Sequence, residues 1–153
     1  MKQLGWATIE QSKKLVEAGL DHNTADMHYC FEDGEIGMYD IDEITREHCI
    51  LDVKGEYGYD EEYMKKHMIP CWSLGALIDL LPKTIETKKP KNLYFFEILP
   101  ANNCVAYTAL NERKEMVFLK MFATGVESDA TLIDNMVSMI CWLLNNNYIR
   151  KEK

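Results

Sequence analysis

Long hydrophobic runs are missing from this 153-residue sequence. None of its apolar stretches approaches the ~20 residues that a membrane-spanning helix needs. Charged side chains at Glu10, Lys13, Lys14 and Glu17 also interrupt the start of the chain, where a secretory signal would carry an apolar core. We therefore expect a cytoplasmic protein without a membrane partner.

Paired cysteines are missing as well. The five cysteines are Cys30, Cys49, Cys71, Cys104 and Cys141. No two of them form a Cys-x-x-Cys pair, so a zinc knuckle or a redox dithiol has no local support. Reduced, mostly buried thiols are expected instead. Cys71 follows His67 by four residues, a spacing that suggests a catalytic pair of nucleophile and base. That spacing brings two side chains together only on one face of a helix, and Pro70 between them disfavours a helix.

Motifs that bind cofactors or support catalysis are also absent. The sequence has no Gly-x-Ser-x-Gly elbow, no His-Glu-x-x-His motif and no glycine-rich phosphate loop in front of a helix. No cofactor is predicted. Enzymatic activity stays open, with no motif in its favour.

Basic residues are scarce between residues 31 and 62. This stretch, which we call the acidic segment, holds twelve acidic residues and only two basic ones, Arg46 and Lys54. Its charge is 2 − 12 = −10, while the whole chain carries −8. Nucleic acid binds through Lys and Arg, so direct nucleic-acid binding is disfavoured. A basic protein partner is electrostatically favoured.

The stretch DIDEITREHC inside the acidic segment holds the strongest candidates for a site. Its acidic partner-binding candidates are Asp40, Asp42, Glu43 and Glu47. Together with His48 they are also typical of divalent-cation ligands, which gives a first alternative, a metal-assisted hydrolase. A second alternative is an acidic inhibitor that mimics nucleic acid. A solvated acidic surface, however, needs no ligand at all.

Three aromatic residues complete the set of candidates. Tyr57 and Tyr59 lie among acids and glycines, where tyrosines can provide contact surface at low entropic cost. Trp142 falls among the polar residues Asn135, Ser138 and Asn145 of a helix pattern. Because interfaces favour Trp and Tyr, we predict a homodimer as one partner.

Two stretches near the middle and start of the chain have complete helix signals. Thr8 and Gln11 have capping-box spacing, and Gly19 stands where a helix over residues 8–18 would stop. Ser73 is a good N-cap for a helix that Pro82 ends.

A third helix is predicted to begin at Ser128 and to end in the asparagines at 145–147. Its apolar positions repeat at helical spacing: Ile133, Met136, Val137, Ile140, Leu143 and Leu144.

Aromatic and branched residues predict strands at 93–99, 104–111 and 115–122, joined by short turns into an antiparallel meander. Further short strands are expected around 27–31, 36–41 and 48–53. Residues 82–92 are predicted to be a solvated basic connector. In 93–99 both the odd-numbered and the even-numbered positions hold apolar residues, which predicts that both faces of the sheet are covered. We expect helices on one face and the acidic segment on the other.

The fold prediction is a single α+β domain over residues 1–153, in which a meander of three or more strands packs with three helices. Three blocks, ATIEQSKKLVEAGLDHNTADM, IPCWSLGALIDLLPK and MVSMICWLLNNNYI, resemble a group of small uncharacterised proteins from prophages and mobile elements of gut anaerobic bacteria. The resemblance implies a cytoplasmic accessory protein and brings no catalytic residue. We predict a non-enzymatic protein-binding or regulatory module.

Overall fold

The computed structural model describes residues 5–31, 49–53, 68–125 and 130–152. These residues form two compact parts. The N-terminal part holds the described residues up to Ala76 together with Lys151 and Glu152, and the C-terminal part holds Leu77–Arg150. The prediction of a single domain stays a prediction.

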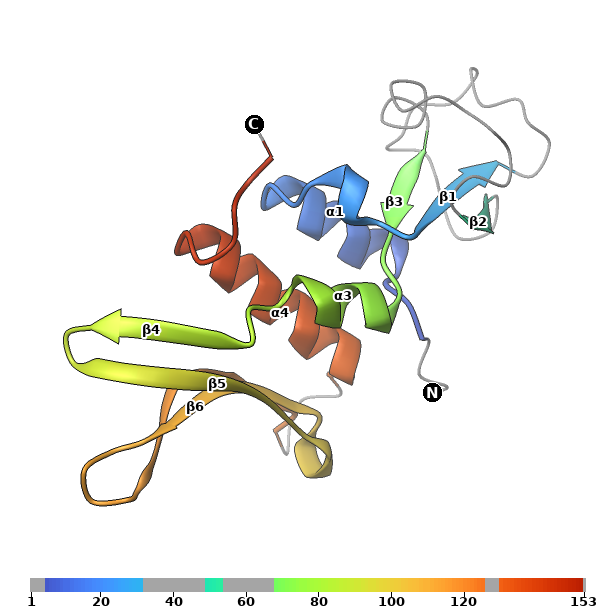
Figure 1. The fold of residues 1–153 in the computed structure, drawn as a ribbon. Helices are drawn as coiled ribbons and strands as arrows, with labels where there is room; N and C mark the ends of the chain where they lie inside the picture. Colours follow the sequence, from blue (N-terminus) through green and yellow to red (C-terminus); the bar gives the residue numbers. More distant parts are fainter. Residues whose placement is uncertain (1–4, 32–48, 54–67, 126–129, 153) are drawn as a thin grey trace. The chain divides into compact units, whose positions relative to one another are not determined.

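The N-terminal part is a small antiparallel sheet with one α-helix against it (Figure 1). Its elements are α1 (Ile9–Glu17), the 3-10 helix η1 (His22–Thr24) and strands β1 (Met27–Phe31), β2 (Cys49–Val53) and β3 (Ile69–Cys71). The strand order is β2-β1-β3, and α1 contacts β3. The predicted strands at 27–31 and 48–53 are therefore confirmed, whereas the one at 36–41 lies outside the described residues.

Helix α1 confirms both of its sequence signals. The amide of Gln11 donates to Thr8 Oγ1 at 3.2 Å, and the amide of Thr8 donates to Gln11 Oε1 at 2.9 Å, which makes a capping box. At the other end Gly19 has φ of +97°, a left-handed conformation that glycine adopts without a Cβ clash. The amide of Leu20 then donates to the Leu15 carbonyl at 3.0 Å, as in a Schellman end.

Helix α3 (Leu74–Leu80) runs from one part into the other. Ser73 caps it as predicted, because its Oγ accepts from the amide of Ala76 at 3.1 Å. The helix ends two residues before Pro82.

The C-terminal part is a four-stranded antiparallel sheet in the order β4-β5-β6-β7. Its elements are β4 (Thr84–Lys88), β5 (Lys91–Leu99), the 3-10 helix η3 (Pro100–Asn102), β6 (Cys104–Leu110), β7 (Met116–Phe122) and α4 (Leu132–Asn145). Helix α4 lies on one face and contacts β6 and β7 (Figure 1). Both parts combine helices with antiparallel strands, so the predicted α+β class is confirmed.

The predicted basic connector at 82–92 is wrong, because these residues form β4 and its turn into β5. Ile85 pairs with Tyr94 and is buried, while its neighbours Thr84 and Glu86 are exposed. A strand with one buried side chain and charged neighbours is typical of a sheet edge. The meander therefore has a fourth strand beside the three predicted ones.

The predicted start of the last helix at Ser128 is also wrong. Helix α4 begins at Leu132, and Thr131 and Asp134 form its capping box. The predicted apolar positions are all buried, and the helix ends at Asn145 within the predicted asparagines. Asn147 has φ of +60°, a left-handed conformation that asparagine tolerates after a helix. Asn135 does not lie on an exposed polar side: it is buried and donates to the Asn103 carbonyl at 2.9 Å.

Candidate functional site

Most of the predicted site residues lie outside the described residues. These are Asp40, Asp42, Glu43, Glu47, Tyr57 and Tyr59, and the alternative ligand His48 is among them as well. Their roles stay predictions. Within the described ranges, no group of three or more His, Cys, Asp or Glu side chains is placed to hold a metal ion. No described helix is both long and apolar enough to cross a bilayer.

Trp142 is the one predicted partner-binding residue that the structure describes. Its ring stacks on Tyr148, with centroids 5.4 Å apart and planes at 27°. The Lys120 ammonium lies 6.0 Å from the Trp142 ring and 5.0 Å from the Phe122 ring, at cation–π range. Trp142 is half-buried and already has partners in its own chain, so it does not stand out as a free contact residue.

The Cys71 thiol is buried beside the N-terminal segment. Its Sγ donates to the Ala7 carbonyl at 3.3 Å, and the Tyr29 hydroxyl donates to the same carbonyl at 2.6 Å. Burial raises the pKa of Cys71 to about 12, against a smaller opposing effect of the Tyr29 hydroxyl. The thiol therefore stays protonated at neutral pH, which opposes the nucleophile that the His67 spacing suggested.

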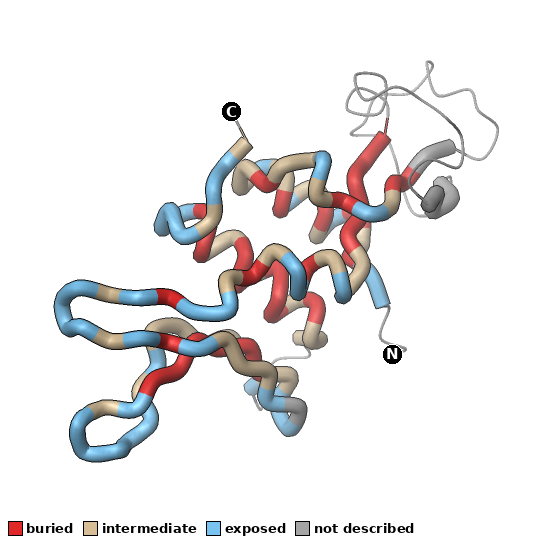
Figure 2. The backbone as a smooth tube through the Cα atoms, in the orientation of Figure 1, coloured by how far each residue is buried: buried red, intermediate tan, exposed pale blue. Residues whose placement is uncertain are grey.

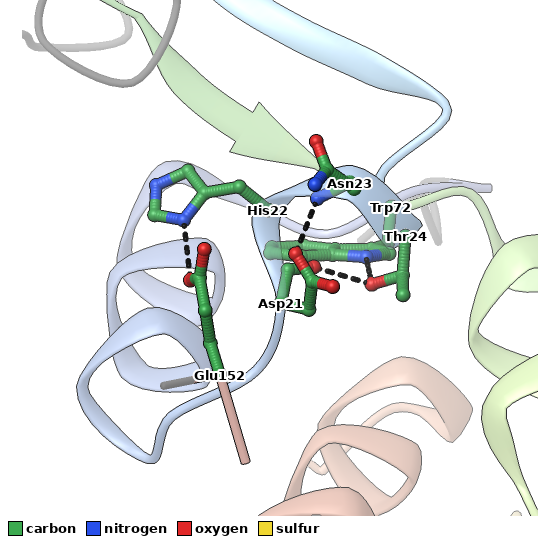
Figure 3. Close-up of polar contacts among 6 residues, drawn as sticks. All are labelled: Asp21, His22, Asn23, Thr24, Trp72 and Glu152. Carbon is green, nitrogen blue, oxygen red and sulfur yellow. Dashed lines mark hydrogen bonds and ion pairs between the residues drawn. The ribbon is translucent and has the colours of Figure 1, made fainter. Parts of the chain in front are cut away.

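Trp72, which belongs to the block IPCWSLGALIDLLPK, is a core residue. It is fully buried, and its Nε1 donates to Thr24 Oγ1 at 3.0 Å (Figure 3). The Thr24 hydroxyl donates onward to the Asp21 carbonyl at 2.6 Å. In the same view Glu152 Oε2 lies 3.3 Å from His22 Nδ1. This network stabilises the N-terminal part and leaves no open position for a ligand at the indole.

The sheet face that α4 does not cover is apolar and open to solvent. We call it the open face and define it by seven large side chains: Leu93, Phe95, Leu99, Leu110, Met116, Phe118 and Met121. Each of them is exposed by between 39% and 66%. In Figure 2 exposed residues recur along β5 and fill most of the turn between β6 and β7, whereas most of α4 is buried. Single exposed apolar residues are normal, but seven on one sheet face are not.

The strand register places these side chains in rows across the sheet. Phe95 is opposite Thr108, and Thr108 is opposite Phe118. On the next row Leu110 is opposite Met116. Leu93 lies on this row as well, because continuing the β5–β6 register by two residues from Phe95 and Thr108 sets it across from Leu110. Phe96 and Tyr107 belong to the other face, where α4 lies. Because the two apolar rows are adjacent, the centre of the open face is uncharged across β5, β6 and β7, and Glu86 adds a charge to the Leu93 row at the edge strand β4.

Charged side chains flank that centre at its two ends. Lys91 begins β5 and pairs with Lys88, so one end is basic. Glu97 is opposite Ala106 on the far side of the Phe95 row, and Glu86 lies on the edge strand. With two lysines and two glutamates, the face has a net charge of zero, in contrast to the −8 of the chain.

A hollow at the end of the same sheet is a weaker candidate. It is lined by Ala101, Asn102, Asn103, Thr124 and Gly125. These side chains include no general acid, general base or nucleophile of shifted pKa, so the hollow indicates no reaction.

Comparisons with protein-family models, with curated proteins and with solved structures found no match to this chain. Sequence reasoning missed the open face. The sequence did contain a signal for it: the odd-numbered positions of β5 include the apolar residues Leu93, Phe95 and Leu99, which alternate with residues of the covered face. We predicted that both faces of this strand are covered, but Leu93, Phe95 and Leu99 are exposed. Most of the acidic segment, which was the predicted cover of this face, lies outside the described residues.

Proposed function

We propose that this protein is a non-enzymatic protein-binding module whose contact surface is the open face. The observation that supports this proposal is the group of seven exposed apolar side chains on one side of a regular sheet, which includes the aromatic residues Phe95 and Phe118. Exposed apolar patches larger than a few hundred Å² typically mark interaction sites. Aromatic residues and methionine are enriched at interfaces relative to other surface, and both types are present here.

A rigid support makes the surface suitable for binding. The strands of the open face are hydrogen-bonded to their neighbours, and α4 packs against β6 and β7 on the other side of the sheet. Tyr107, buried in the central strand, donates from its hydroxyl to the Pro82 carbonyl at 2.7 Å. A pre-organised surface loses little conformational freedom on binding, so the module needs no folding step to recognise its partner.

The test is site-specific photo-crosslinking in cells that naturally make the protein. A benzophenone amino acid replaces Phe95 on the open face or, as a control, Glu112 in the exposed turn between β6 and β7. We expect a discrete protein adduct from position 95 that is absent from position 112. The adduct should disappear when Phe118→Thr is added. Equal yields at both positions, or no protein adduct at 95, would overturn the proposal.

The acidic segment is a second proposed contact surface, supported by its segregated charge of −10. Replacing Asp40, Asp42, Glu43 and Glu47 with their amides should weaken any complex with a basic protein and reduce the salt dependence of its affinity. Metal analysis of the purified protein tests the alternative hydrolase, because stoichiometric tight metal would favour that function instead.

A further inference from the structure

We infer that the open face is covered by a second copy of this chain, packed face to face with the strand direction reversed. This inference rests on the proposed function, because it names the partner of the same surface. Three properties of the open face support it: its area, its charge, and the positions of Lys91 and Glu97 relative to its centre.

The area is sufficient for a stable dimer. Each of the seven large side chains exposes about half of its surface, or ~100 Å² on the scale of large apolar side chains, which gives roughly 700 Å² in total. A standard protein–protein interface buries about 800 Å² on each partner. The flanking residues Thr84, Glu86, Lys91 and Glu97 would supply the remainder. No further segment is needed to complete an interface of normal size.

The charge of the face is compatible with self-association. Two copies of a chain that carries −8 repel each other over most of their surface. The open face is the exception, because its two lysines and two glutamates cancel and its two central rows are uncharged on β5, β6 and β7. A strongly basic partner would find little to pair with here, whereas a second copy meets a neutral apolar surface.

The order of charges along β5 selects one arrangement of the two copies. Lys91 and Glu97 are six residues apart on the same face, or about 20 Å along the strand. The midpoint between them falls between the Leu93 row and the Phe95 row. A two-fold axis through that midpoint, in the plane of the interface and perpendicular to the strands, exchanges the two ends. It sets Lys91 opposite the partner's Glu97 and the Leu93 row on the partner's Phe95 row.

The competing two-fold arrangement is electrostatically worse. An axis parallel to the strands would leave their direction unchanged and bring Lys88 and Lys91 over the same basic end of the partner. Like charges placed across an interface are unfavourable. In the reversed arrangement, Lys and Glu side chains are long enough to meet across the ~10 Å that separates packed sheets.

Charge exchange tests this arrangement directly. Lys91→Glu and Glu97→Lys are made separately, and self-association is measured by analytical ultracentrifugation in low salt. Each variant alone brings like charges together at both copies of the pair, so the dimer dissociation constant should rise roughly tenfold. An equimolar mixture should form a heterodimer with nearly the wild-type constant, because both pairs are then opposite in sign. Because residues 91 and 97 lie about 20 Å apart in one chain, a restored affinity cannot come from an ion pair between them within that chain.

Matched controls carry the same charge changes elsewhere. Lys14→Glu and Glu17→Lys lie on exposed positions of α1 and should leave the dissociation constant within a factor of two. Phe118→Thr should raise it at least tenfold, because it removes apolar contact at the centre.

The outcomes separate the two proposals. A wild-type protein that stays monomeric at high concentration overturns this inference, as does a dimer in which mixing fails to restore affinity. If position 95 then crosslinks to a different protein, the protein-binding function stands with another partner. If it crosslinks only within its own chain, or to nothing, both proposals fail.

Discussion

Phe95 and Phe118 flank Thr108 from opposite sides on the open face, since the register sets each of them directly across from it. Thr108 is buried although its two neighbours are about half exposed. The aromatic rings therefore provide a continuous apolar row over a small central residue. This relationship distinguishes a contact surface from scattered surface hydrophobics, and it makes single substitutions informative.

Phe118→Thr should weaken binding at the open face without destabilising the fold. Phe118 is 45% exposed, and threonine keeps a side chain suited to a strand. The free energy of unfolding at low protein concentration should stay within about 0.5 kcal/mol of wild type. Urea denaturation followed by circular dichroism measures this.

Phe96→Thr is the comparison for that substitution. Phe96 lies on the covered face, with its ring centroid 5.7 Å from that of Tyr107. Removing it should cost about 2 kcal/mol or more while leaving the binding surface unchanged. If the two substitutions were equally destabilising, the assignment of an open and a covered face would be wrong.

Trp72→Phe should destabilise the N-terminal part. The substitution removes the hydrogen bond from the indole to Thr24 Oγ1 and part of the volume of a fully buried side chain. We expect a loss of about 1–2 kcal/mol in the free energy of unfolding. Trp6→Phe is the control, because Trp6 is 36% exposed and should cost less than about 0.5 kcal/mol. A larger effect at Trp6 would contradict the core role of Trp72.

Local signals in the sequence predicted the parts of the fold that local contacts determine. The capping box of Thr8 and Gln11 and the Ser73 cap each involve hydrogen bonds within three residues, so sequence spacing alone specifies them. Strand β4 was missed because its charged residues face solvent and only Ile85 is buried, a pattern close to that of a loop.

The site could not be predicted in the same way. Residues 93–99 are apolar on both parities, so the alternation that normally separates a buried face from a solvated face is missing. Which face α4 covers depends on tertiary packing and on the register with β6 and β7. The sequence therefore indicated an unusual strand but not that its odd-numbered side chains are exposed.

Thr131→Ala should destabilise the C-terminal part, because Thr131 caps α4. Its Oγ1 accepts from the Asp134 amide at 3.2 Å, and its own amide donates to Asp134 Oδ2 at 2.8 Å. Loss of such a cap typically costs about 1 kcal/mol. Ser128→Ala is the comparison, because the sequence placed the helix start there. If the Ser128 substitution proved the costlier one in urea denaturation, α4 would begin earlier than Leu132.

Alkaline pH should destabilise the protein partly through Cys71. Its thiol has a pKa of about 12 when folded against an ordinary value of 9.0. The folded state therefore favours the protonated form. The resulting stability is fully present below pH 9 and is lost as the pH rises from 9 towards 12. When the pH is raised from 8 to 10.5, the free energy of unfolding should fall in both proteins, and the fall should be about 1–2 kcal/mol smaller for Cys71→Ala than for wild type.

The comparison with Cys71→Ala isolates the Cys71 thiol because the other alkaline contributions are common to both proteins. Burial also raises the pKa of the Tyr107 hydroxyl and of the Cys104 thiol, which adds the same loss of stability to each protein as the pH rises. Alkylation at pH 8 gives an independent check: the half-buried Cys141 should react well before the buried Cys71. If Cys71 reacted first, or if the two proteins lost stability equally on raising the pH, its thiol would not be held protonated by burial against the Ala7 carbonyl.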